Sequence, residues 1–163
     1  MHFNKFKIVD LKNTLGPWLG KTSKIIGCLI NEVLIVNKID LTREQWVVLI
    51  KLNQQDGLAQ NQLAFITERD KTSLTRLINI MERKNLVVRK ASKKDKRVKL
   101  VFLTETGKTA FKKALPVMQN IIQNLQKGLT QKEIKDTIHT LQKLQNNLTF
   151  LSANCGGSHK LKI

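Results

Sequence analysis

Arginine and lysine side chains that gather in one segment are the residues of this sequence best suited to chemistry. Residues 83–99 hold nine basic side chains and the single acid Asp95, a net charge of +8 within a chain total of +17. Five of the six arginines lie between residues 69 and 97. Because a guanidinium can grip a phosphate or a guanine edge with two hydrogen bonds, this placement predicts a surface that binds nucleic acid.

The same segment also fits a simpler interpretation, a solvated hairpin whose lysines keep it soluble and block pairing at a sheet edge. A basic chain attracts polyanions, so an anionic membrane surface is a second candidate partner. The longest apolar runs fall far short of the roughly 20 residues that span a bilayer, and we expect no signal peptide. Cys28 and Cys155 are the only cysteines and lie far apart, which suits a reducing compartment. We therefore expect a cytoplasmic protein that does not associate with membranes.

Apolar periodicity predicts the helices that precede the basic segment. Pro17 suits the first position of a helix extending to about residue 38, with an apolar stripe over Ile25–Leu34. The stretch Thr42-Arg43-Glu44-Gln45 has the pattern of a capping box and predicts the start of a second helix. Asp56-Gly57 would end that helix, and a short helix would follow at about Gln60–Ile66.

A helix and a hairpin are predicted next. The apolar residues of this helix fall at i, i+3, i+4 and i+7, namely Leu74, Leu77, Ile78 and Met81. Two runs rich in β-branched residues, Leu86–Val88 and Val98–Leu103, flank the polar stretch Arg89–Arg97. They predict two strands joined by a long basic tip.

Two further helices are predicted at the carboxyl end. The first would extend from Thr104 to about Lys127 with a kink at Pro116, and a capping box at Thr130–Glu133 would open the second, with an apolar stripe over Ile134–Leu151. Adjacent helices joined by a tight turn and followed by a basic hairpin are typical of a winged helix-turn-helix. The predicted fold class is mainly α.

Several stretches of residues 41–107 resemble the MarR family of bacterial regulators, in order and without a gap. The family's second helix is matched by Leu41–Trp46, and its recognition helix by Asp70–Ile78. The exit into the wing is matched by Glu82–Val87, and the wing tip and return strand by Asp95–Arg97 and Leu100–Gly107. The chain is thereby identified as a member of the family, with a β-hairpin wing and long N- and C-terminal dimerisation helices.

The resemblance implies one MarR-like domain over residues 1–163. Residues 41–107 would be its DNA-binding part, 17–38 and 108–151 its helical dimerisation part, and 152–163 a flexible tail. A homodimer would place its two recognition helices in successive major grooves of a pseudo-palindromic operator in double-stranded DNA. The implied function is a sequence-specific transcriptional regulator, a repressor that a ligand releases. The apolar stripes alone would equally allow internal packing of a monomer.

The resemblance also implies which side chains meet DNA. On the recognition helix these are Lys71, Thr72, Ser73, Thr75 and Arg76, although Arg76 could instead pair with an acid of the domain. In the wing they are Lys93, Lys94, Asp95, Lys96 and Arg97. The carboxylate of Asp95 would orient the guanidinium of Arg97, which could enter a narrow, A·T-rich minor groove. Ala59, where many relatives have a capping Thr or Ser, predicts a poorly capped third helix.

Many relatives bind a small, often aromatic, anionic effector between the two parts. Trp18 and Trp46 could line such a cavity, although aromatic residues on helix faces are more often plain core. Cys28 is the possible redox sensor, but a cysteine beside apolar residues is usually buried and inert. The peroxide-sensing branch of the family carries its cysteine nearer the start of that helix, at the position matched here to Trp18.

Other functions have less support in the sequence. His2, His139 and His159 are scattered, and we find no paired carboxylates, phosphate-binding glycine loop or nucleophile elbow. We expect no enzyme activity, no metal site and no cofactor. The excess of wing lysines keeps open an alternative, an architectural protein that coats A·T-rich DNA with little specificity.

Overall fold

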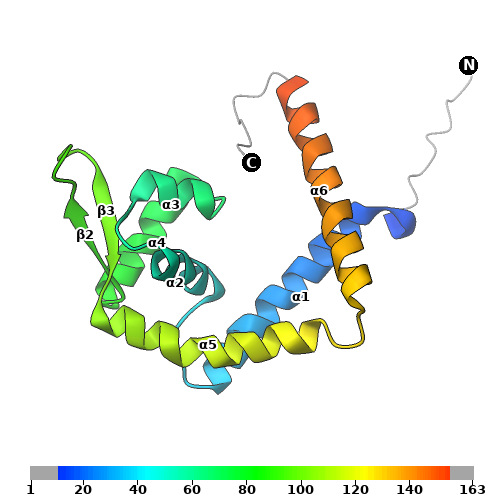
Figure 1. The fold of residues 1–163 in the computed structure, drawn as a ribbon, viewed down its shortest axis with the longest axis horizontal. Helices are drawn as coiled ribbons and strands as arrows, with labels where there is room; N and C mark the ends of the chain where they lie inside the picture. The colour runs from blue at the N-terminus through cyan, green and yellow to red at the C-terminus, as the bar shows by residue number, and fades with distance from the viewer. Residues whose placement is uncertain (1–10, 155–163) are drawn as a thin grey trace, which may run out of the picture.

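The computed structural model describes residues 11–154, which form a mainly helical fold with one small antiparallel sheet (Figure 1). A 3-10 turn at Leu11–Asn13 comes before the first long helix. The elements then follow as α1 (Leu15–Val36), α2 (Arg43–Gln54), β1 (Leu58–Ala59), α3 (Gln60–Ile66), α4 (Lys71–Arg83), β2 (Val87–Ala91), β3 (Lys99–Leu103), α5 (Glu105–Leu125) and α6 (Gln131–Asn154). This order confirms the predicted winged helix-turn-helix with long helices at both ends.

Local sequence signals set the starts of the helices. Thr42 Oγ1 accepts the N–H of Gln45 at 3.3 Å, and the Gln45 side chain accepts the N–H of Thr42 at 3.1 Å, so the predicted capping box of α2 is present. The box that opens α6 is present too, between Thr130 and Glu133. As expected, Ala59 provides no side-chain cap for α3.

The sheet has the strand order β1-β3-β2, so β3 lies in the middle and the hairpin β2–β3 forms the wing. Val101 of β3 pairs with Leu58 on one side and Arg89 on the other. The sequence did not predict β1, because a strand of two residues is too short to display a period. Through β1 the wing is joined to the helix-turn-helix at its base.

The apolar face of α4 packs into the core. Asp70 caps this helix by accepting the N–H of Ser73 at 2.8 Å. The four residues predicted to share its apolar face, Leu74, Leu77, Ile78 and Met81, are all buried, against α2, α3 and the sheet. The face opposite them is therefore left for solvent or a partner.

Gly107 fixes the junction between the wing and α5. The Thr104 side chain caps α5 by accepting the N–H of Gly107 at 3.0 Å, and it donates to the carbonyl oxygen of Asn85. A Cβ on Gly107 would lie 2.0 Å from the carbonyl oxygen of Leu86, so no larger residue fits there. The exit from α4 and the start of α5 are thus held against each other.

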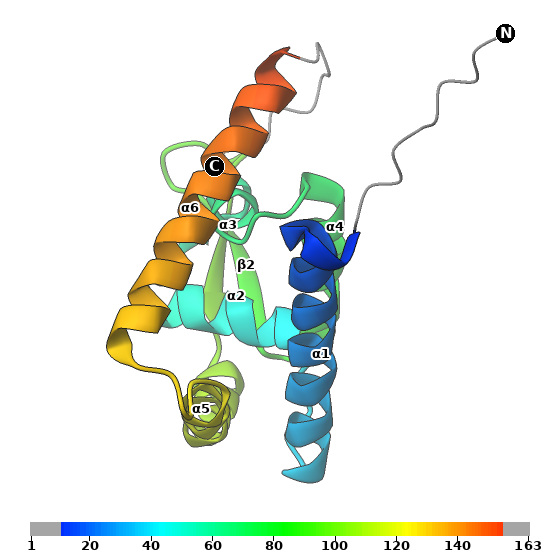
Figure 2. The ribbon, with the colours of Figure 1, turned by 90° about the vertical axis from the view of Figure 1, so that its right-hand side faces the viewer.

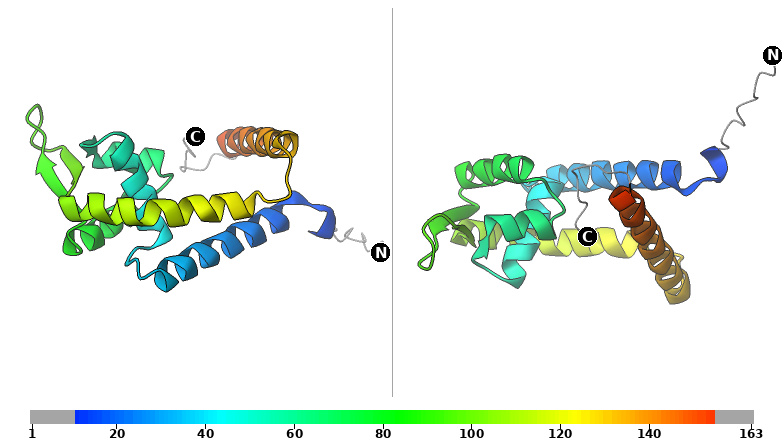
Figure 3. Two further views of the ribbon diagram at one scale, coloured as in Figure 1. Left: turned by 60° about the horizontal axis from the view of Figure 1, so that its bottom comes forward. Right: turned by 90° about the horizontal axis from the view of Figure 1, so that it is seen from above.

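The long helices form the other part of the molecule. α5 extends away from the winged part beside α1, and α6 turns back from its end and stands apart (Figures 1 and 3). In Figure 2, which views α5 end on, α1 lies on one side and α6 on the other. The apolar side chains of these helices, among them Ile25, Leu29, Ile122, Ile138 and Leu148, are largely exposed in the single chain.

Two boundaries differ from the sequence-based expectation. α1 begins at Leu15, so Pro17 lies inside its first turn, where a missing N–H still costs nothing. α5 continues through Pro116, as predicted. α6 extends to Asn154, into the stretch predicted as a flexible tail, and the rest of that tail lies outside the described residues.

The contact at Gly107 leads to a stability prediction. Gly107→Ala should lower the free energy of unfolding by about 1–3 kcal/mol, because the new methyl group overlaps a backbone oxygen that cannot move freely. Gly16→Ala is the matched control: it lies in the first turn of α1 with nothing within 4 Å of its Cβ, and it should gain up to about 1 kcal/mol. Urea unfolding followed by circular dichroism measures both, and equal effects would contradict this packing.

Candidate nucleic-acid interface

The first turns of α4 present free polar side chains. Lys71, Thr72 and Arg76 are exposed or half-buried, and their side chains make no hydrogen bond or ion pair with any residue of the described range 11–154. The alternative in which Arg76 pairs with an acid of the domain is therefore not seen. These groups are available to a partner at the amino end of the helix, where the helix dipole favours an anion.

Ser73 and Thr75, predicted beside them, are instead half-buried and have partners within the domain. Gln60 Nε2 donates to Thr75 Oγ1 at 2.7 Å, and this hydroxyl donates to the carbonyl oxygen of Lys71 at 2.8 Å. Arg69 Nη1 donates to Ser73 Oγ at 3.2 Å. The two hydroxyls hold α4 against α3 and the turn before it. Gln60 was missed because only the packing of α3 on α4 identifies its role. The sequence places Arg69 among the clustered basic side chains but does not predict its contact with Ser73.

The wing tip is exposed and strongly basic. Lys93, Lys94, Lys96 and Arg97 are all exposed. Asp95 Oδ1 accepts the backbone N–H of Arg97 at 2.9 Å, and no contact between this carboxylate and the Arg97 guanidinium is present. The expectation that Asp95 orients the guanidinium is thus corrected: the carboxylate shapes the backbone of the turn.

Arg89 differs from the other wing cations. Its Nε donates to Glu82 Oε2 at 3.0 Å, and its Nη2 donates to the same oxygen at 2.5 Å and to Asn79 Oδ1 at 2.7 Å. Hydrogen bonds from Arg89 hold the pKa of the Glu82 carboxyl below its usual value. One arginine of the predicted reading segment is therefore bound inside the domain.

The free cations lie on two elements of the winged part. Lys71 and Arg76 lie on α4, and the other four lie in the wing, at the end of the molecule away from α6 (Figure 1). Against them the wing tip holds only one acid, Asp95, whose Oδ1 is hydrogen-bonded to the backbone. Such a surface attracts a polyanion and can bind it through both charge and hydrogen bonds.

The two tryptophans are not brought together. Trp46 is buried and stacks on Phe111 with ring centroids 5.1 Å apart, so it belongs to the core. Trp18 is 58% exposed on α1, and its indole N–H donates to the carbonyl oxygen of Lys12 at 2.9 Å. Cys28, expected to be buried, is exposed on α1 in the single chain.

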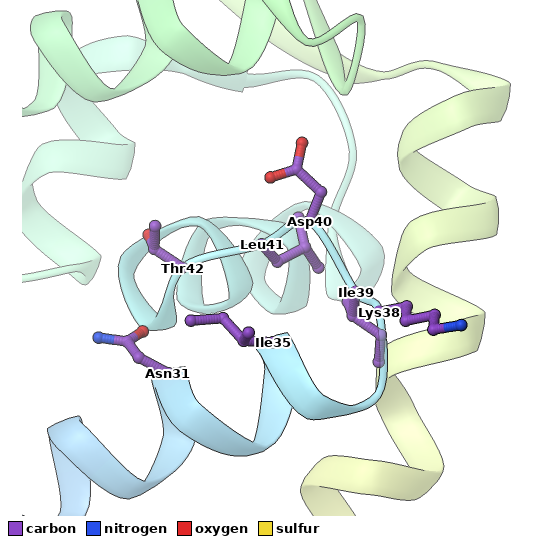
Figure 4. A pocket seen from close by; sticks show the side chains of 7 residues that line it. All are labelled: Asn31, Ile35, Lys38, Ile39, Asp40, Leu41 and Thr42. Carbon is purple, nitrogen blue, oxygen red and sulfur yellow. The ribbon is translucent and has the colours of Figure 1, made fainter.

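A hollow of about 630 Å³ lies instead at the junction of α1 and α2. Figure 4 shows its lining, which combines apolar and polar side chains: Asn31, Ile35, Lys38, Ile39, Asp40, Leu41 and Thr42. Neither tryptophan lines it. Two lysines fix the loop between α1 and α2 that lines this hollow. Lys84 Nζ contacts Asp40 Oδ1 at 2.6 Å, and Lys113 Nζ donates to the carbonyl oxygen of Lys38 at 3.0 Å.

Across the described residues, 11–154, no helix has the length and apolar character needed to cross a membrane.

Comparisons with known proteins agree with this geometry. The family model for the MarR family matches residues 41–99. A structure of a mutant MarR from E. coli, complexed with operator DNA, is 28% identical over 80% of this chain and 92% of that one, with a TM-score of 0.73. MepR from S. aureus, in a complex with DNA, is 27% identical over 83% and 98%, with a TM-score of 0.77.

A third similar structure carries a small molecule. CouR from Rhodococcus jostii RHA1, bound to p-coumaroyl-CoA, is 22% identical over 82% of this chain and 92% of that one, with a TM-score of 0.69, which supports the shared fold. The chain therefore matches the MarR family model over its helix-turn-helix and most of its wing, and it shares the fold of these transcriptional regulators over its long helices as well.

Proposed function

We propose that this chain is a sequence-specific DNA-binding regulator, a repressor that binds a pseudo-palindromic operator as a homodimer. One observation carries the proposal: the outer face of α4 and the exposed wing tip hold six cations that have no partner within residues 11–154. MarR and MepR, which share the fold, have been solved with DNA. We assign residues 41–107 to DNA binding.

The free side chains suggest how the DNA is read. α4 would enter the major groove, where Thr72 and Arg76 reach base edges and Lys71 contacts a phosphate. Arg97 would enter the adjacent minor groove, and Lys93, Lys94 and Lys96 would contact phosphates. Ser73 and Thr75 would act mainly as supports, because their hydroxyls already have neighbours within the domain.

Exposed apolar side chains support the dimer. Ile25 of α1 is 56% exposed and Ile138 and Leu148 of α6 are 50% and 51% exposed, and soluble monomers rarely leave so many such residues on long helices uncovered. We assign residues 17–38 and 108–151 to the dimer interface, with the same surface of a second copy as the partner. Each subunit would then present one α4 to one half-site.

The hollow at the junction of α1 and α2 is the candidate effector site. It lies where the proposed dimerisation helix passes into the DNA-binding part, so a ligand there could change the angle between them (Figure 4). Lys38 lies beside apolar residues in its lining, which suits a small molecule with an apolar body and an anionic group. CouR, which has the same fold, is solved with a CoA thioester bound.

The first prediction concerns salt and Arg97. Affinity for a duplex that the protein selects from a random library should fall steeply with salt, with a slope of about −0.9 for each phosphate neutralised. Arg97→Ala should weaken binding to that duplex by roughly 1–3 kcal/mol. Lys127→Ala, which removes a charge from the loop between α5 and α6, is the control and should change little. A flat salt dependence would overturn the proposal.

The second prediction concerns the dimer. Light scattering should give twice the chain mass of 18.6 kDa for the natural protein. The double variant Ile138→Glu, Leu148→Glu should give the single mass, because it places charges in the apolar interface. Asn146→Glu adds a charge at an exposed polar position on another face of the same helix and should leave the dimer intact. A natural protein that scatters as a monomer would contradict this role for α6.

A further inference from the structure

A cluster of polar side chains joins the wing to α4 and takes no part in the proposed contact with DNA. Glu82 lies on the last turn of α4, and Arg89 is the third residue of β2. The two side chains are only 29% and 26% exposed, and their contact is the shortest ion pair among the described residues. Asn79, one turn before Glu82 on α4, accepts a further hydrogen bond from the same guanidinium.

Glu82 binds both the side chain and the main chain of Arg89. Its Oε1 accepts the backbone N–H of Arg89 at 2.8 Å, while its Oε2 accepts Nε and Nη2. The strand is therefore attached to the helix at its backbone, and the guanidinium extends the attachment to a second turn of α4. A planar guanidinium that forms several hydrogen bonds fixes direction as well as distance.

The cluster lies at the base of the hairpin, so it influences where the wing tip lies. Ala91 and Lys99 are the last paired residues, and the basic tip extends beyond them without support from another element. Within residues 11–154, the base of the hairpin is attached to the domain by β1 on one edge and by the cluster on the other, and β3 between them packs against α2, α3 and α5. A small rotation at the base would move the tip relative to the free face of α4.

We propose that Glu82 and Arg89 are positioning residues that hold the wing and α4 at one fixed spacing, so that both meet DNA in a single register. This inference rests on the proposed function. Arg89 then supports DNA binding without contacting DNA. Glu82 supports it as well, although its negative charge is repelled by DNA. Rigidity of this kind favours one sequence over others, because a mobile wing would adapt to many duplexes at a cost in entropy.

Replacing Glu82 separates positioning from simple electrostatics. Glu82→Gln removes one negative charge from each chain, so a purely electrostatic role predicts tighter binding to every duplex. Both oxygens of Glu82 accept hydrogen bonds, so an amide must turn its NH₂ group against one of the donors. The positioning role therefore predicts weaker binding to the selected duplex and no loss on a random duplex.

The experiment compares full-length variants on two probes, a duplex selected by the natural protein and a random-sequence duplex of equal length. Measured well below the unfolding temperatures of the variants, the affinities of Glu82→Gln and of Arg89→Gln for the selected duplex should each fall about tenfold or more. The salt slope of Arg89→Gln should equal that of the natural protein, because no phosphate contact is lost. Arg89→Lys, which keeps the charge, should recover part of the affinity. Lys99→Gln, at an exposed position on β3, is the control and should affect both probes alike.

Hydrogen exchange in the absence of DNA provides a second test, of the mobility of the wing. Backbone amides of residues 87–103 should exchange faster in Glu82→Gln and Arg89→Gln than in the natural protein, with α2 unchanged and no such effect in Lys99→Gln. Unchanged wing exchange would overturn the inference, as would natural or tighter binding of Glu82→Gln to the selected duplex. A natural protein that selects no sequence would contradict the proposed function and, with it, the role in DNA register.

Discussion

Burial of one face of α4 is the interaction on which the rest of the structure depends. Leu74, Ile78 and Met81 are fully buried, and they fix the rotation of the helix about its own axis. Side chains three and four positions apart share a face, so the same rotation turns Thr72 and Arg76 outward. Turning the helix by one position would bury charge and expose Leu74. The core and the candidate interface are therefore specified by one packing arrangement.

Polar side chains around α4 divide into those that hold the domain together and those that remain free. Gln60 and Thr75 join α3 to α4, and Arg89 and Glu82 join α4 to the wing. The free cations lie beyond these attachments, on the first turns of α4 and at the wing tip. A frame held by internal hydrogen bonds, with cations left unpaired, suits a partner that is itself rigid and negatively charged, as double-stranded DNA is.

Much of this arrangement follows from local sequence signals. The capping box at Thr42 and the apolar face of α4 depend on neighbouring residues, and both were predicted and are present. The bounds of α3 were also predicted, although β1 immediately before it was not. A two-residue strand exists only because β3 lies beside it, and no local pattern reports that contact.

The partners of individual side chains could not be predicted for the same reason. Arg89 and Arg97 look alike in the sequence, yet one is bound by Glu82 and the other is free, because the hairpin folds back on α4 through a tertiary contact.

Hydroxyl-radical footprinting on the selected duplex, in the presence of excess competitor DNA, tests the central claim most directly. A dimer that inserts two α4 helices into successive major grooves should protect two patches on one face of the DNA, about 10 base pairs apart. Both patches should persist under competition. Continuous protection that disappears as competitor is added would contradict sequence-specific recognition and would indicate a protein that coats DNA without reading it.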